Sequence, residues 1–115
     1  MSLQGSCHCG AVKFEVQGTP ESVMECNCSH CQRKGFKLWF VPETEFSLLQ
    51  GADALTTYRF NKHVIDHQFC KTCGCQAFGR GHAEDGTSLY AVNVRCIENE
   101  DIDSIPVNKV DGRSF

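Results

Sequence analysis

Several features that would assign this sequence to a common class are missing from it. Residues 1–6 contain no charged segment followed by an apolar run, so no secretory leader is recognisable. No apolar run approaches the length needed to span a bilayer, and we therefore expect no membrane partner. The formal net charge is -3 and the basic residues are scattered. This balance argues against a nucleic-acid partner, because such binding rests mainly on neutralising phosphates.

The sequence also has no internal repeat and no long stretch with helical periodicity. Its 115 residues suit one domain, which we expect to cover residues 1–115. Short apolar runs recur between turn residues, and they predict an all-β fold of several packed, coiled antiparallel sheets. Strands are predicted at residues 11–16, 38–41, 46–49, 55–60, 64–69 and 89–94, with a short one at 76–78, and residues 22–26 form a short apolar run that leads into a group of cysteines.

Some of these segments carry more specific expectations. The strand at 38–41 is entirely apolar, which predicts burial on both faces and an end at Pro42. The strands at 55–60 and 64–69 are expected to form a hairpin. Residues 29–34 could form one helical turn that ends at Gly35, and residues 101–104 a second brief turn. Residues 79–86 are rich in glycine and polar side chains, which predicts a loop.

What the sequence has in excess is cysteine. The nine cysteines are an odd number, which fits a disulfide framework poorly. Most of them are spaced so closely that disulfides between neighbours would constrain little of the chain. Since no leader is recognisable, we expect a cytoplasmic protein with reduced thiols. In that setting such spacings usually indicate metal binding or catalysis.

Two cysteine pairs predict one closed metal site. Cys70 and Cys73 lie two residues apart and precede Gly74, which is the usual form of a zinc half-site. Cys7 and Cys9 alternate along an extended segment, so both thiols project to the same side and can supply the other half. A closed site of four thiolates would be structural. The alternative for Cys70 and Cys73 is a redox-active or unliganded pair.

Three further cysteines, Cys26, Cys28 and Cys31, predict a second site with an open fourth position. An open position is the mark of a catalytic zinc site. Zinc with three thiolates carries a charge of about -1, so it should acidify a bound water less than a site of neutral histidines does. A substrate thiol therefore suits the position better than water. The alternative is a second structural site that Cys75, Cys96 or a histidine completes.

The remaining candidates are less specific. Cys96 would share a strand face with Tyr90, Val92 and Val94, so we expect a buried core thiol there. His67 is expected to be either a hydrogen-bonded core histidine or a wall of the open site. Cys75 remains open in role, and Trp39 is expected in the core. The other histidines are expected to be exposed: His8, His30, His63 and His82.

Four segments together resemble one known family. They are Gly5-Ser6-Cys7-His8-Cys9-Gly10-Ala11-Val12, Cys26-Asn27-Cys28-Ser29-His30-Cys31, Phe69-Cys70-Lys71-Thr72-Cys73-Gly74 and Val92-Asn93-Val94-Arg95-Cys96. In this order they are similar to the family of glutathione-dependent formaldehyde-activating enzyme and centromere protein V. The resemblance implies an Mss4-like fold, shared with certain small Rab-binding zinc proteins. It also implies a structural zinc on Cys7, Cys9, Cys70 and Cys73, and a catalytic zinc on Cys26, Cys28 and Cys31.

The resemblance further implies carbon–sulfur lyase activity, in which glutathione and formaldehyde interconvert with S-hydroxymethylglutathione. We therefore predict a zinc-dependent lyase that acts on a small thiol, such as glutathione, and a small aldehyde. The alternative is a non-catalytic zinc module that binds a protein partner. Three thiols with an open position favour the enzyme, whereas a fourth protein ligand would favour the module.

Overall fold

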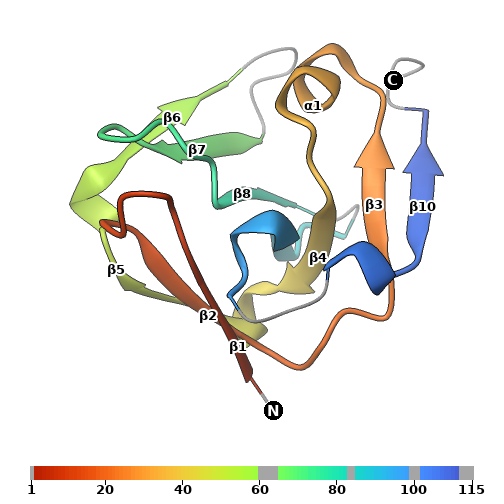
Figure 1. Ribbon diagram of the computed structural model, residues 1–115, viewed down its shortest axis with the longest axis horizontal. Coiled ribbons are helices and arrows are strands. Elements are labelled where there is room, and N and C mark those ends of the chain that lie inside the picture. Colours follow the sequence, from red (N-terminus) through yellow and green to blue (C-terminus); the bar gives the residue numbers. More distant parts are fainter. Residues whose placement is uncertain (1, 60–64, 83–84, 99–101, 112–115) are drawn as a thin grey trace.

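Short strands dominate the chain in the computed structural model (Figure 1), which describes residues 2–59, 65–82, 85–98 and 102–111. The strands are β1 (Ser2–Ser6), β2 (Lys13–Gln17), β3 (Val23–Cys26), β4 (Leu38–Pro42), β5 (Phe46–Gln50), β6 (Leu55–Tyr58), β7 (Asp66–Cys70), β8 (Phe78–His82), β9 (Ser88–Asn93) and β10 (Val107–Val110). The helical elements are α1 (Ser29–Lys34) and the 3₁₀ turns η1 (Glu43–Glu45), η2 (Ala52–Ala54), η3 (Val94–Cys96) and η4 (Ile102–Ser104).

These strands form two sheets. A three-stranded sheet has the order β1-β2-β5, and a seven-stranded sheet has the order β10-β3-β4-β9-β8-β7-β6. Every pair of neighbours is antiparallel except β10 and β3, which run parallel. Figure 1 shows β1, β2 and β5 on one side of the molecule, with β3 and β10 side by side on the other. The predicted all-β fold is confirmed, with one parallel pair added.

Three phenylalanines that pack against one another join the two sheets. Phe14 of β2 is fully buried, as the alternation of this strand predicts, whereas its neighbour Lys13 is exposed. The ring centroids of Phe14 and Phe46 are 5.6 Å apart, and those of Phe46 and Phe78 are 4.9 Å apart. Phe14 and Phe46 belong to the three-stranded sheet and Phe78 to the seven-stranded one. Burying each ring contributes about 2 kcal/mol, so this contact fixes how the sheets pack.

The expected hairpin and both expected helical turns are present. β6 pairs antiparallel with β7, with Leu55 opposite Cys70, while the expected turn at 61–63 lies outside the described residues. Helix α1 occupies the predicted residues and ends at Gly35, whose φ of 68° is in the left-handed region. The second turn is η4, although residue 101 lies outside the described part. No helix of the described ranges is long and apolar enough to cross a bilayer.

The strand β4 corrects one prediction, because only one of its faces is consistently covered. Leu38 and Val41 are buried, but Phe40 is 46% exposed. β3 pairs with β4 only at Met24 and Leu38, so the two strands separate beyond that point. The face of β4 that carries Leu38 and Phe40 is therefore covered at Leu38 and open at Phe40.

The segment predicted as a loop at 79–86 is partly a strand. β8 continues to His82 and pairs with both β7 and β9. Glycines weaken strands in isolation, but here a neighbouring strand lies close to Gly79: a Cβ there would meet the carbonyl oxygen of Asp66 at 3.4 Å. β1 and β10 were not predicted either. β1 is mostly polar and β10 is half polar, and their strand structure depends on pairing with β2 and β3.

Candidate metal centres

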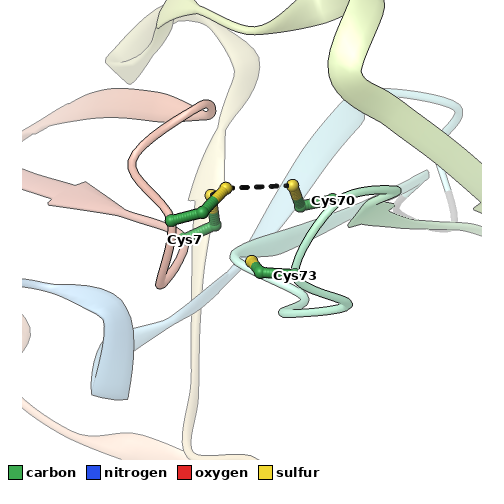
Figure 2. Close-up of side chains that lie close together, drawn as sticks. Cys7, Cys70 and Cys73 are labelled. Atoms are coloured by element: carbon green, nitrogen blue, oxygen red, sulfur yellow. Dashed lines mark hydrogen bonds between the residues drawn. The ribbon is translucent and has the colours of Figure 1, made fainter.

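Four cysteines from two distant segments meet at one point. Cys7 and Cys9 follow β1, Cys70 ends β7, and Cys73 lies in the turn after it. The Sγ of Cys9 is 3.6 Å from the Sγ of Cys7 and 3.6 Å from that of Cys70. All four sulfur atoms lie within 4.8 Å of one another. Figure 2 shows the thiols of Cys7, Cys70 and Cys73 facing the same space.

Backbone groups hold these sulfurs in place. The N–H of Gly74 donates to the carbonyl of Cys70 at 2.8 Å and closes the turn, and Gly74 has a φ of 79° that favours glycine. The N–H of Val12 donates to Cys7 Sγ at 3.4 Å. Backbone N–H groups of Cys9 and Cys75 lower the pKa of the Cys73 thiol to about 6. Donors aimed at sulfur favour the thiolate, which is the form that binds metal.

The dimensions of this cluster fit a tetrahedral metal site. Zinc–sulfur bonds of about 2.3 Å place the sulfurs of a tetrahedron about 3.8 Å apart, close to the separations seen here. Cys7 is 2% exposed and Cys70 is 0% exposed, so two of the four sulfurs are shielded from water. The cluster can therefore hold a metal ion such as zinc. It would join the turn after β1, in the three-stranded sheet, to the end of β7 in the seven-stranded sheet.

Three cysteines around the start of α1 form the second cluster. Cys26 ends β3, Cys28 is the N-cap of α1, and Cys31 lies in its first turn. The N–H of Cys31 donates to Cys28 Sγ at 3.3 Å, and the N–H of Cys28 donates to Cys26 Sγ at 3.5 Å. The three sulfurs lie within 4.8 Å of one another, and no fourth ligand of the described residues joins them.

The pKa values of Cys28 and Cys31 shift in opposite directions at the helix start. Desolvation acts to raise the pKa of Cys28, but the N–H of Cys31 and further hydrogen bonds outweigh it, so the pKa is lowered. Burial, together with Cys28, raises the pKa of Cys31. An N-terminal helix position favours a thiolate because unsatisfied N–H groups point at it. Without a metal ion Cys28 is thus the first of this pair to ionise, and a cation would favour the ionised form of all three.

A cleft of about 580 Å³ opens beside this second cluster. Two of its thiols, Cys26 and Cys31, line the cleft. The other lining residues come from the end of β3, from α1 and the residues next to it, from η3, and from β10 and the residue after it: Glu25, Asn27, Gln32, Gly35, Phe36, Arg95, Lys109, Val110 and Asp111. Sequence reasoning missed Arg95 and Lys109. Lys109 had no signal, because the strand that places it opposite Glu25 and at the cleft is itself set by pairing with β3.

On another side of α1, His30 packs in an aromatic cluster. This corrects the prediction that His30 is exposed. Its ring centroid is 4.2 Å from that of His67 and 5.9 Å from those of Tyr58 and Phe36. Burial, then the nearby His67 and Lys34, lower the pKa of His30 to about 4. Burial also lowers the pKa of His67. Of the other histidines, His8 and His82 are exposed as predicted, and His63 lies outside the described residues.

Two cysteines lie outside both clusters. Cys75 and Cys96 face each other with their sulfurs 3.5 Å apart. β9 ends at Asn93, so Cys96 lies in η3 and does not continue the strand face of Tyr90 and Val92. Cys96 packs against the core, as predicted. It is half-buried, however, and not fully buried as the prediction had it. Neither thiol is placed to complete the cluster of Cys26, Cys28 and Cys31.

Comparison with known proteins identifies sequences of the same kind. The family model described as "Glutathione-dependent formaldehyde-activating enzyme" matches residues 2–108. A Halomonas elongata protein named "Putative glutathione-dependent formaldehyde-activating enzyme" is 29% identical over 82 residues, covering 64% of this chain and 52% of that protein. A Talaromyces marneffei protein of the same name is 32% identical over 84 residues, covering 68% of this chain and 44% of that protein.

This chain therefore spans about half the length of the curated relatives that it matches. A crystal structure of a Rhodobacter sphaeroides protein is similar over 91% of this chain and 99% of that chain, with a TM-score of 0.76 and 30% sequence identity. The mostly β architecture with its two cysteine clusters is typical of the Mss4-like fold.

Proposed function

Because this chain belongs to the family of glutathione-dependent formaldehyde-activating enzymes, we propose that it is a zinc-dependent carbon–sulfur lyase. It would act as one zinc-binding domain on a small thiol, such as glutathione, and a small aldehyde. Cys7, Cys9, Cys70 and Cys73 would hold a structural zinc. Cys26, Cys28 and Cys31 would hold a catalytic one.

One observation carries this proposal. The three-cysteine cluster lies at a cleft, and the four-cysteine cluster lies where two sheets join. A metal with three protein ligands beside a cleft can accept a substrate group, whereas a metal with four cannot. When bound at Cys26, Cys28 and Cys31, zinc would supply an open position that favours the thiolate form of a substrate thiol.

The residues of the cleft would hold the remainder of the thiol substrate. Arg95 and Lys109 are cations that can bind carboxylates, and glutathione carries two of them. The Nε of Arg95 donates to the carbonyl of Gly35 at 3.2 Å, which positions its guanidinium at the end of α1. Asn27 donates to Asp111 at 2.9 Å, and this contact fixes another part of the cleft lining. Beside two of the thiols the cleft thus offers one anchored cation, Arg95, and a second cation, Lys109, together with the carboxylates of Glu25 and Asp111.

The proposed reaction forms or breaks one carbon–sulfur bond. In the forward direction the substrate sulfur adds to the aldehyde carbon, and the proton from the thiol passes to the aldehyde oxygen. In the reverse direction the hydroxyl loses that proton and the sulfur leaves with its electron pair. Neither an oxidant nor a reductant is needed, so thiol and aldehyde account for all atoms and electrons.

Exchange spectroscopy tests the proposal directly. Glutathione and formaldehyde interconvert with their adduct in water, and magnetisation transfer measures that rate. We expect the wild-type protein to accelerate the exchange and Cys28→Ser to abolish the acceleration. The matched control is Cys75→Ser, which changes a cysteine outside both clusters and should retain the rate. A zinc-loaded wild-type protein that leaves the exchange rate unchanged with glutathione and other small thiols would contradict the proposal.

The alternative is a non-catalytic zinc module that binds a protein partner. A second groove of about 520 Å³, between the end of β2, the start of β3 and β4, favours it. Its walls include Met24, Trp39 and the 46% exposed Phe40, an aromatic surface of the kind that partners cover. Trp39 was expected in the core, and it does pack against the core, but it is only half-buried. The groove therefore exposes part of its ring. Loss of partner binding in Phe40→Ser, with no lyase activity in the wild type, would support the module.

A further inference from the structure

The pair formed by Cys75 and Cys96 has no part in the proposed lyase reaction. Their sulfurs are 3.5 Å apart, although the residues are 21 positions apart in the chain. Cys75 follows the turn of Cys70 and Cys73, and Cys96 ends the 3₁₀ turn η3. Two thiols that meet from separate segments, next to the four-cysteine cluster but not part of it, form a site with a chemistry of their own.

We propose that Cys75 and Cys96 are a dithiol–disulfide couple that exchanges with the disulfide of a small thiol. A disulfide bond is about 2.05 Å long, so the two sulfurs must approach each other by about 1.5 Å. This proposal does not depend on the lyase activity.

The backbone on both sides of the pair is anchored. The carbonyl of Cys75 accepts from the N–H of Cys70 at 3.0 Å. In η3, the N–H of Ile97 donates to the carbonyl of Val94 at 3.0 Å, and Ile97 also forms a bridge with Gly5 of β1. The two thiols are therefore held opposite each other by contacts that do not involve their sulfurs. Such pre-positioning raises the effective concentration of one thiol toward the other.

The pair is also the most suitable target for oxidation. Both residues are partly exposed, whereas Cys7 and Cys70 are nearly inaccessible. The other seven cysteines of the described chain are grouped as two sets of metal ligands. Bound metal would mask those seven sulfurs, and it would leave Cys75 and Cys96 as the free thiols.

The exchange balances in two steps. One thiolate of the pair attacks a sulfur of the small disulfide, forms a mixed disulfide and releases one small thiolate. The second thiolate then attacks the protein sulfur of that mixed disulfide and releases the second small thiolate. The pair loses two electrons and two protons in total. The small disulfide gains them and becomes two small thiols.

The resulting bond would link two regions that serve different centres. The N–H of Cys75 donates to the sulfur of Cys73, a member of the four-cysteine cluster. Arg95, the residue before Cys96, lines the cleft beside the three-cysteine cluster. A covalent link between residues 75 and 96 would also restrict the unfolded chain, so the oxidised protein should melt at a higher temperature.

The test uses the zinc-loaded full chain and bis(2-hydroxyethyl) disulfide, an uncharged oxidant. After oxidation, free thiols are blocked with N-ethylmaleimide and peptides are mapped by mass spectrometry without reduction. We expect one cross-linked peptide pair that contains Cys75 and Cys96, unchanged zinc content and a higher melting temperature. Excess 2-mercaptoethanol should reverse all of these changes.

Single variants identify the intermediate. Cys75→Ser and Cys96→Ser should each stop at a mixed disulfide on the remaining thiol, and the double variant should form neither product. If both thiols of the wild type stay free while the reagent oxidises a control dithiol, the proposal is wrong. Cross-linking of metal-cluster cysteines with loss of zinc, before any link between Cys75 and Cys96, would overturn it as well. The wild-type experiment decides the matter even if a variant fails to fold.

Discussion

The two cysteine clusters use the same ligand atom in opposite structural settings. Cys9 and Cys70 are 61 residues apart in the chain, so the four-cysteine cluster connects distant segments and both sheets. Cys26, Cys28 and Cys31 lie within one short segment at the start of α1 and beside a cleft. Sulfur ligands alone therefore do not determine a role. What separates the clusters is the length of chain that each one closes and the cleft that opens beside the three-cysteine cluster.

The largest expected effect is on folding, from Cys73→Ser. Removing one ligand of a closed site that joins two sheets costs metal-coupled folding energy, so we expect a loss of at least about 3 kcal/mol and a melting temperature lower by about 10 °C or more. Cys28→Ser should cost less than about 1 kcal/mol, because its cluster closes only a local segment. Thermal melts of the zinc-loaded variants compare the two. Equal destabilisation would erase the proposed division of roles.

Metal removal should sharpen the same contrast. We expect up to two zinc ions per chain, and a mild chelator should remove the ion of the three-cysteine cluster first, because that site has fewer protein ligands. A colorimetric zinc indicator should record a fast phase and a slow phase. Cys28→Ser should lose the fast phase only. Protein that is purified without chelators and contains no zinc, with every thiol titratable, would refute both sites.

A smaller effect is expected from the cleft. Arg95→Ala should raise the KM for a thiol with carboxylates about tenfold and change kcat little, since a charged hydrogen bond is worth about 1.5 kcal/mol. For 2-mercaptoethanol, which has no carboxylate, the KM should not change. Steady-state kinetics with the two thiols separate these outcomes. An equal effect on both thiols would mean that Arg95 supports the cleft structure and does not bind substrate.

The smallest effect is expected from the histidine pair beside α1. Burial and, to a smaller extent, Lys34 lower the pKa of His67 below its ordinary value of 6.5, although Asp66 acts to raise it. His30 packs on the ring of His67. Between the lowered pKa and 6.5 the unfolded chain binds more protons, so stability should fall as the pH drops through that window. His67→Gln should weaken this dependence. Denaturant unfolding at several pH values measures it, and an unchanged slope would exclude His67 as its source.

Local pattern predicted some of this structure well. The alternation of buried and exposed residues around Phe14 and the glycine after α1 are local features of the sequence. The strand β2 and the end of the helix could therefore be predicted. The spacing of the cysteines likewise grouped them as the structure does. The limit was tertiary context. β10 exists because it pairs with β3, and the exposure of Phe40 depends on where β3 leaves β4.

The same limit explains what was missed around the candidate sites. Lys109 reaches the cleft only through the β10–β3 pairing. His30 was expected in solvent, but its ring packs on His67 from a strand 37 residues further along the chain. Cys75 and Cys96 gave no spacing signal, since the loop after β7 and the end of β9 bring them together. No local sequence pattern predicts such contacts between residues that are far apart in the chain.

The central claim is that the cluster of Cys26, Cys28 and Cys31 has room for a substrate sulfur. Cobalt substitution tests this most directly, because each sulfur ligand adds to the sulfur-to-metal absorption. Titrating glutathione into the cobalt protein should raise that band and release protons, since the metal binds the thiolate. Cys28→Ser should lose the response. A spectrum that stays unchanged with every thiol, together with a fourth protein ligand on the metal, would contradict the claim and favour the non-catalytic module.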